Sequence, residues 1–177
     1  LHLSSAASDV YKRQTLFKPV NGSCEDYIYC KVHEGFKKAH EELWPHTLQK
    51  IRELGLENKT ITFTGHSLGG AIAVLFARSA KMTYGWNITD TYTFGQPIVG
   101  NKDFNAHFLK VMGDTKLFRV VHFKDPVPRI PPEYIIGFKL GYEPQLDEVW
   151  YDEDFTKYNL CTDNLKFCSY DVLGSGV

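Results

Sequence analysis

The residues best suited to covalent chemistry lie at positions 65–69, with the order Gly-His-Ser-Leu-Gly. This run matches G-x-S-x-G, the nucleophile elbow, in which a serine occupies a sharp turn between a strand and a helix. Ser67 is then a candidate nucleophile for acyl transfer. The backbone N–H of Leu68, directly after it, is the expected first donor to the oxyanion of such a reaction.

The glycines of this run explain how such a turn could form. An elbow forces its serine toward rarely populated backbone angles and brings neighbouring chain close. Gly65, Gly69 and Gly70 are therefore expected at places where a Cβ would not fit. The alternative is a Gly-Ser turn that merely begins a helix. Context favours the elbow, because residues 60–64 predict a strand before the serine and residues 68–82 predict an apolar helix after it.

A serine hydroxyl needs a base to remove its proton, and that base is usually a histidine held by a carboxylate. Around an elbow the chain order is serine, then acid, then histidine. Asp125 fits the acid position, since it follows the most strand-like run, residues 116–123, and begins a proline-rich loop. Its alternative role is to start a turn before proline. Asp147 and Asp152 are weaker candidates, because they follow no clear parallel strand.

The seven histidines all precede Asp125, so none occupies the expected place of the base. His66 adjoins the nucleophile but is expected to point elsewhere on the elbow. His122 lies within a strand, where a packed and hydrogen-bonded structural role is expected. Two interpretations remain: the base lies beyond Val177, or the chain is a homologue that has lost catalysis. We favour the first, because the amino end shows independent signs of being cut.

Strand-like and helix-like runs alternate along the chain. Strands are expected at residues 27–33, 60–64, 90–94 and 116–123, and helices at residues 34–54 and 68–82 and after a cap at Asn101 or Asp103. This order predicts an α/β fold with a mainly parallel sheet and helices on both faces. The residues that follow are expected to add strands or edge decoration. At 177 residues, the chain can form one domain that buries about 70% of its unfolded surface.

Composition excludes several classes of protein. Hydrophobic residues make up 43% of the chain and charged residues 23%, which argues against disorder and coiled coils. With 20 Lys and Arg against 21 Asp and Glu, the chain lacks the basic footprint of a nucleic-acid-binding protein. No apolar run approaches the roughly 20 residues that span a bilayer. We therefore expect a soluble or peripheral protein without a nucleic-acid partner or a transmembrane segment.

Cysteines and sequons together indicate a secretory route. The four cysteines form two local pairs, Cys24 with Cys30 and Cys161 with Cys168. Neither pair has zinc-site spacing, so two small disulfide-closed loops are expected, although four cysteines allow three pairings. Three N-glycosylation sequons begin at Asn21, Asn58 and Asn87. The alternative is a cytosolic protein with four free thiols.

The two ends of the chain look cut. Residues 1–14 have no coherent periodicity and are expected to be a non-native, adaptor-like leader, which leaves residues 15–177 as a partial domain. The last residues contain no capping element. We therefore expect a truncated domain.

Five ordered motifs resemble the fungal-type triacylglycerol lipases, the class 3 lipase family of the α/β-hydrolase fold. They are residues 30–36 (CKVHEGF), 61–71 (ITFTGHSLGGA), 93–97 (TFGQP), 119–128 (RVVHFKDPVP) and 148–151 (EVWY). The similarity runs from about Cys24 to Cys168. Several motifs at family-like separations are more specific than the elbow alone.

The resemblance implies Ser67 as nucleophile and Asp125 as triad acid. It implies a catalytic histidine in an Asp-His motif shortly after the last cysteine. It also implies an upstream Ser or Thr as second oxyanion donor and a helical lid, both before Thr15. The implied substrate is a lipid ester at a lipid–water interface, and neither a metal nor an organic cofactor is expected.

Other functions use the same residues. A phospholipase, a feruloyl-type esterase or an acyltransferase could share the elbow, because the lid and pocket walls select the substrate. A catalytically inactive lipid-binding or storage homologue is the alternative from a different class. Without its base, the present chain is itself expected to be inactive.

Overall fold

The computed structural model describes residues 18–135, 138–145, 147–162 and 168–169. The elements follow in the order β1 (Pro19–Asn21), β2 (Lys31–His33), α2 (Glu34–Glu53), β3 (Thr64–His66), α3 (Leu68–Tyr84), β4 (Thr91–Phe94), α4 (Lys102–Met112), β5 (Leu117–His122), η1 (Val127–Arg129), β6 (Tyr134–Ile135), β7 (Phe138–Lys139), β8 (Glu148–Tyr151) and β9 (Tyr158–Cys161). Residues 1–14, expected to be a leader, lie outside the described residues.

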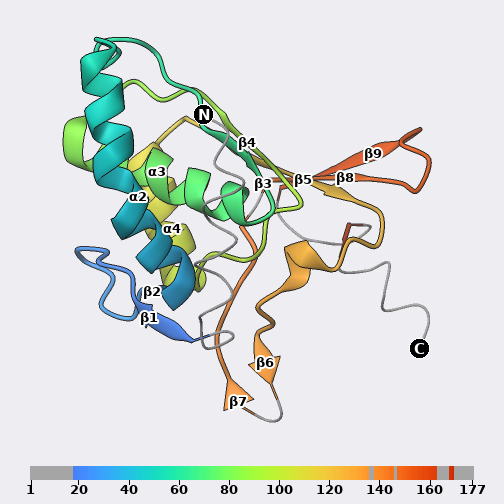
Figure 1. Cartoon of the computed structure of the whole chain (residues 1–177). Helices are drawn as coiled ribbons and strands as arrows, with labels where there is room; N and C mark the ends of the chain where they lie inside the picture. The colour runs from blue at the N-terminus through green and yellow to red at the C-terminus, as the bar shows by residue number, and fades with distance from the viewer. Residues whose placement is uncertain (1–17, 136–137, 146, 163–167, 170–177) are drawn as a thin grey trace.

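A five-stranded sheet in the order β3-β4-β5-β8-β9 forms the centre of the molecule (Figure 1). The first four strands are parallel, and β9 returns antiparallel to β8. Because carboxyl ends of parallel strands meet at one edge, the segments that follow β3, β4, β5 and β8 lie at the same edge. The predicted α/β class with a mainly parallel sheet is confirmed.

Helix α3 is the central helix of the layer beside the sheet. It contacts β3 and β4, while α2 and α4 flank it (Figure 1). All eleven of its residues from Gly70 to Ala80 are buried, as expected for an apolar helix between a sheet and two other helices. Of β4, Thr91 and Thr93 are buried, whereas Tyr92 and Phe94 are 43% and 45% exposed. Helices from the described residues therefore cover the threonine face of β4.

Two predicted strands differ from those observed. The run 27–33 forms a strand only at β2, because residues 24–30 are closed into a turn by the Cys24–Cys30 disulfide and by a hydrogen bond from Tyr27 N to Cys24 O at 2.7 Å. Strand β2 pairs antiparallel with β1 instead of joining the parallel sheet. The run 60–64 contributes one isolated bridge, Ile61 with Ile88, and β3 begins only at Thr64.

Helix positions were predicted more closely. α2 contains Pro45 and is followed by Gly55 with φ 64°. The cap of α4 is Asn101, not Asp103, since the Asn101 side chain accepts a hydrogen bond from Phe104 N. Residue types that cap helices therefore predict the start of α4 to within two residues.

Both predicted cysteine pairings are present, Cys24 with Cys30 and Cys161 with Cys168. The three sequon asparagines, Asn21, Asn58 and Asn87, are all exposed, which glycosylation would require. Among the described helices, none combines the length and apolarity that crossing a membrane demands.

Burial keeps two histidines neutral, one at the N-cap of α2 and one within the helix. His33 caps the helix, with Nδ1 accepting from Gly35 N at 3.1 Å and Phe36 N at 3.4 Å. His40 Nε2 lies 2.8 Å from Ser79 Oγ on α3. Burial is the main cause that lowers the pKa of each from 6.5 to about 4.

We expect the free energy of unfolding to fall as the pH decreases from 6.5 to about 4. Over this range the unfolded histidines bind protons that the folded ones do not, at roughly 3 kcal/mol per group or less. Urea unfolding at about pH 7 and about pH 4.5 measures the loss. His40→Gln should reduce it, whereas His46→Gln, at an exposed position of α2, should not. Equal stabilities of the unsubstituted chain at the two pH values would contradict the assignment.

Candidate active site

Ser67 occupies a strained turn directly between β3 and α3. Its φ of 52° and ψ of −128° are unusual for a residue with a side chain, as an elbow requires. The hydroxyl makes no capping bond to the helix that it precedes, and the residue is partly exposed. Leu68 is the first residue of α3, so its N–H has no acceptor within the helix. The turn thus presents a hydroxyl beside a free backbone donor.

Of the three predicted glycines, Gly65 leaves no room for a Cβ and Gly70 leaves only tight room. A Cβ on Gly65 would overlap the backbone of Gly69, and one on Gly70 would lie 3.1 Å from Gly65 O and 3.2 Å from Gln96 Cβ. The prediction for Gly69 is wrong, since no atom among those compared lies within 4 Å of a Cβ built there. Its Cβ would point away from the close approach of Gly65 to the helix backbone.

Asp125 follows β5 at the same edge of the sheet. Its Oδ1 accepts a hydrogen bond from Val127 N at 2.9 Å, so the residue does support the turn that begins its loop. Its Oδ2 lies 2.9 Å from the position that a Cβ on Gly95 would take. Gly95 has a φ of 54° and follows β4 directly. One carboxylate oxygen therefore serves the turn, and the other is directed at the end of the neighbouring strand.

Backbone hydrogen bonds join these three strand ends. Ser67 N donates to Phe94 O at 2.9 Å, and Gly95 N donates to Val120 O at 2.9 Å. The structure thus places Ser67 and Asp125 at the ends of β3 and β5, separated by the end of β4. This is the edge where an acid and a nucleophile of the elbow type must both lie.

Two described histidines, His122 and His66, lie near this edge of the sheet. His122 Nε2 lies 3.0 Å from Glu153 O, and its ring stacks on Phe155 with centroids 4.0 Å apart, in agreement with the predicted structural role. His66 Nε2 lies 3.6 Å from the Cβ position of Gly95, so its ring borders the space that Asp125 Oδ2 also faces. Deeper in the fold, His107 Nδ1 accepts from Arg78 Nε at 3.1 Å.

The expectation that Asp152, a weaker candidate for the acid, follows no parallel strand is wrong. Asp152 follows β8, which pairs parallel with β5. Its carboxylate accepts hydrogen bonds from Thr156 N, Thr156 Oγ1 and Lys157 N at 2.7, 2.8 and 3.1 Å, and these bonds lower its pKa. It therefore holds the β8–β9 turn. Asp147 precedes β8 and so lies at the opposite edge of the sheet.

One cluster of possible metal ligands occurs among the described residues, formed by Glu148, Cys161 and Cys168. The two cysteines are bonded to each other, so neither offers a thiolate. The cluster therefore does not have the donor set of a metal site.

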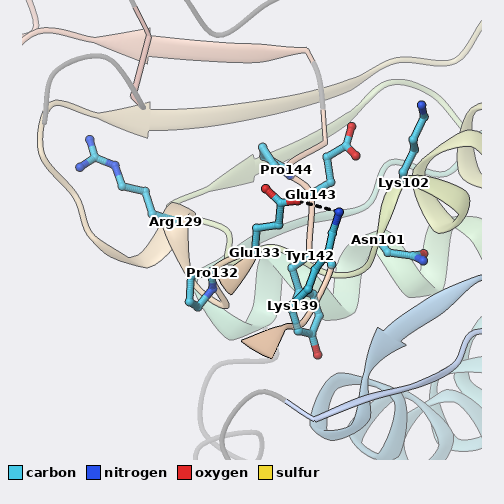
Figure 2. A pocket seen from close by; sticks show the side chains of 10 residues that line it. Asn101, Lys102, Arg129, Pro132, Glu133, Lys139, Tyr142, Glu143 and Pro144 are labelled. Atoms are coloured by element: carbon cyan, nitrogen blue, oxygen red, sulfur yellow. Dashed lines mark ion pairs between the residues drawn. The ribbon is translucent and has the colours of Figure 1, made fainter. Parts of the chain in front are cut away.

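A hollow of about 460 Å³ lies beside η1 (Figure 2). It is lined by the end of the loop that Asp125 begins, by residues around β6 and β7, and by the start of α4. The lining residues are Asn101, Lys102, Arg129, Pro132, Glu133, Lys139, Gly141, Tyr142, Glu143 and Pro144. Lys139 pairs with Glu133 at 3.3 Å within it. Neither Ser67 nor Asp125 lines this hollow. The candidate active site is therefore the edge of the sheet where β3, β4 and β5 end.

A strand, a strained serine turn, a helix and a later aspartate at the same sheet edge are the arrangement of the α/β-hydrolase fold. Comparison with known proteins agrees. The model of the family Lipase (class 3) matches residues 4–135. The chain belongs to the class 3 lipases, and the resemblance of its motifs to fungal lipases is confirmed.

Individual relatives give the same result. A secreted mono- and diacylglycerol lipase of Fusarium solani is 35% identical over 148 residues, which cover 82% of this chain and 42% of the relative. The triacylglyceride lipase of Rhizomucor miehei superposes with a TM-score of 0.71 at 26% identity, over 98% of this chain and 65% of that one. A triacylglycerol lipase whose catalytic centre is a serine protease triad gives 0.72 at 26%, over 96% and 63%. The chain spans less than half of the Fusarium relative.

Proposed function

We propose that the whole protein is a secreted serine carboxylic ester hydrolase, a lipase that acts on acylglycerols at a lipid–water interface. The observation that carries the proposal is Ser67 in a strained strand-to-helix turn, one strand away from a loop with the Asp125 carboxylate. Membership of the class 3 lipases supports it. So does the description of relatives as secreted lipases.

The proposed reaction follows from the geometry of the elbow. Ser67 Oγ attacks the ester carbonyl carbon while a histidine base takes its proton, and the Leu68 N–H stabilises the resulting oxyanion. Collapse breaks the bond to the alcohol, which leaves with that proton. Water then attacks the acyl-enzyme through the same base, releasing the fatty acid and restoring the hydroxyl. Asp125 orients the base and stabilises its charged form.

We propose that the base belongs to a part of the protein outside this sequence, as do the second oxyanion donor and the lid. The resemblance of this chain to the lipase family implies that the histidine follows the last cysteine. The chain spans 42% of the Fusarium relative, so most of such a protein lies outside this sequence. Two disulfides and three exposed sequon asparagines are consistent with secretion, and we propose Asn21, Asn58 and Asn87 as N-glycosylation sites.

Asp125→Asn in the full-length protein is expected to lower kcat for a soluble ester such as p-nitrophenyl butyrate by about 10⁴-fold. An asparagine keeps the shape but no longer holds the histidine in its productive tautomer. Steady-state kinetics measure the loss. Asp147→Asn is the matched control at the other edge of the sheet and should retain activity. Full activity of Asp125→Asn would exclude Asp125 as the acid.

The substrate class is tested separately with emulsified lipids. Hydrolysis of phospholipid alone by the unsubstituted protein would favour a phospholipase.

A further inference from the structure

An ion pair lies entirely inside the protein between β5 and β8. Arg119 and Glu148 are partners in the strand register, their side chains have no exposed surface, and Arg119 Nη2 lies 2.5 Å from Glu148 Oε2. Taking two charges out of water costs free energy, and apolar residues of similar volume often stabilise a protein equally well. Stability alone is therefore a poor explanation for this pair. The backbone groups that the two side chains bind suggest a functional explanation.

Arg119 Nη1 binds backbone carbonyls near Asp125, while Nε donates to Gln145 O, before β8, at 3.2 Å. Nη1 donates to Pro128 O at 3.0 Å and to Gln96 O at 3.2 Å. Pro128 lies in η1, on the loop that Asp125 begins, and Gln96 follows the glycine that Asp125 Oδ2 faces. The Arg119 guanidinium thus connects the loop that begins at Asp125 with the backbone after Gly95, which the Asp125 carboxylate faces.

Glu148 binds a different segment with its two oxygens. Oε1 accepts from Ser169 N and Oε2 accepts from Ser169 Oγ, both at 2.9 Å. Ser169 directly follows Cys168, the end of the second disulfide loop. Under the proposed function, the chain beyond this cysteine leads to the histidine base. Glu148 therefore fixes the entry to that segment.

We propose that Arg119 and Glu148 are positioning residues, which set the acid and the base of the triad relative to each other by binding both supporting segments to one rigid point. This inference rests on the proposed function. A pair of apolar residues could fill the same volume, but it would offer no donor to Pro128 O or Gln96 O and no acceptor to Ser169. Misplacing a catalytic group by about 1 Å can cost about 10²-fold in rate.

The test uses the full-length protein with Arg119→Lys and Glu148→Gln. Lysine keeps the charge but loses the planar fork that reaches several carbonyls, and glutamine keeps the shape but loses the charge. We expect kcat per titrated active site for p-nitrophenyl butyrate to fall about 10- to 100-fold while KM changes less than about twofold. The acid limb of kcat/KM should move to lower pH, because a histidine held less closely by Asp125 has a lower pKa.

A matched control exists on the surface. Arg52 and Glu57 form an exposed pair at 3.2 Å, and Arg52→Lys and Glu57→Gln should change neither kcat nor the pH profile. If the single core variants fail to fold, the double variant Arg119→Met with Glu148→Leu replaces them, since apolar substitution of a buried pair is usually tolerated. It should fold and still lose kcat.

Three outcomes are distinguishable. Folded variants with kcat and acid limb at wild-type values would reduce the pair to a purely structural role and overturn the inference, while Ser67-dependent turnover of the wild type leaves the proposed function intact. Folded variants with low kcat, unchanged KM and a shifted acid limb would support it. A wild-type protein without Ser67-dependent turnover would overturn both.

Discussion

Ser67→Ala in the full-length protein should lower kcat for p-nitrophenyl butyrate by about 10⁵- to 10⁶-fold. Removing the nucleophile of a serine hydrolase costs about as much as removing the whole triad, and only oxyanion stabilisation and binding remain. KM should change little, because the hydroxyl contributes to bond formation and not to binding of the acyl chain.

The matched control for this variant lies on the same helix. Ser79 is buried in α3 and contacts His40, far along the helix from its first residue. Ser79→Ala should lower stability by about 1 kcal/mol, the usual net contribution of a hydrogen bond, and leave kcat unchanged. Retained turnover in Ser67→Ala would exclude the elbow as the source of the nucleophile.

The 177-residue chain on its own should hydrolyse the same soluble ester at least about 10⁴-fold more slowly than the full-length protein. Its nucleophile and acid are expected to be in place, but a serine without a base is almost unreactive at neutral pH. The two proteins are compared at equal concentration of folded protein, which circular dichroism and unfolding curves establish for the short chain.

The short chain also tests which histidine could act. Ser67-dependent turnover close to that of the full-length protein would show that one of its own seven histidines serves as base. His66 would then be the first to substitute, because its ring borders the space beside Gly95 that Asp125 also faces. Absence of turnover in a folded chain agrees with a base from elsewhere in the protein.

The features predicted correctly from the sequence depend on local chemistry. The strained turn at Ser67, the ends of α2 and α3, and a cap for α4 at Asn101 or Asp103 depend on residues within a few positions of each other. Turn strain, capping and helical periodicity act over such distances, so a single sequence is enough to locate them.

The errors arise where distant segments decide the structure. Strand propensity at residues 27–30 is overridden by the Cys24–Cys30 disulfide. β8 becomes a parallel strand through pairing with β5, which a four-residue run cannot reveal. The Arg119–Glu148 pair had one local signal, an arginine at the inward position between Leu117 and Val121 in a strand with alternating burial. Its partner and the carbonyls that it binds are found only in the folded protein.

The most direct test of the nucleophile assignment is covalent trapping. The full-length protein is treated with diethyl p-nitrophenyl phosphate, which phosphorylates activated serines, and the modified peptide is identified by mass spectrometry. One diethylphosphoryl group on Ser67, formed in parallel with the loss of esterase activity, is the predicted result. Loss of activity with the group on another residue, or full activity after stoichiometric modification of Ser67, would contradict it.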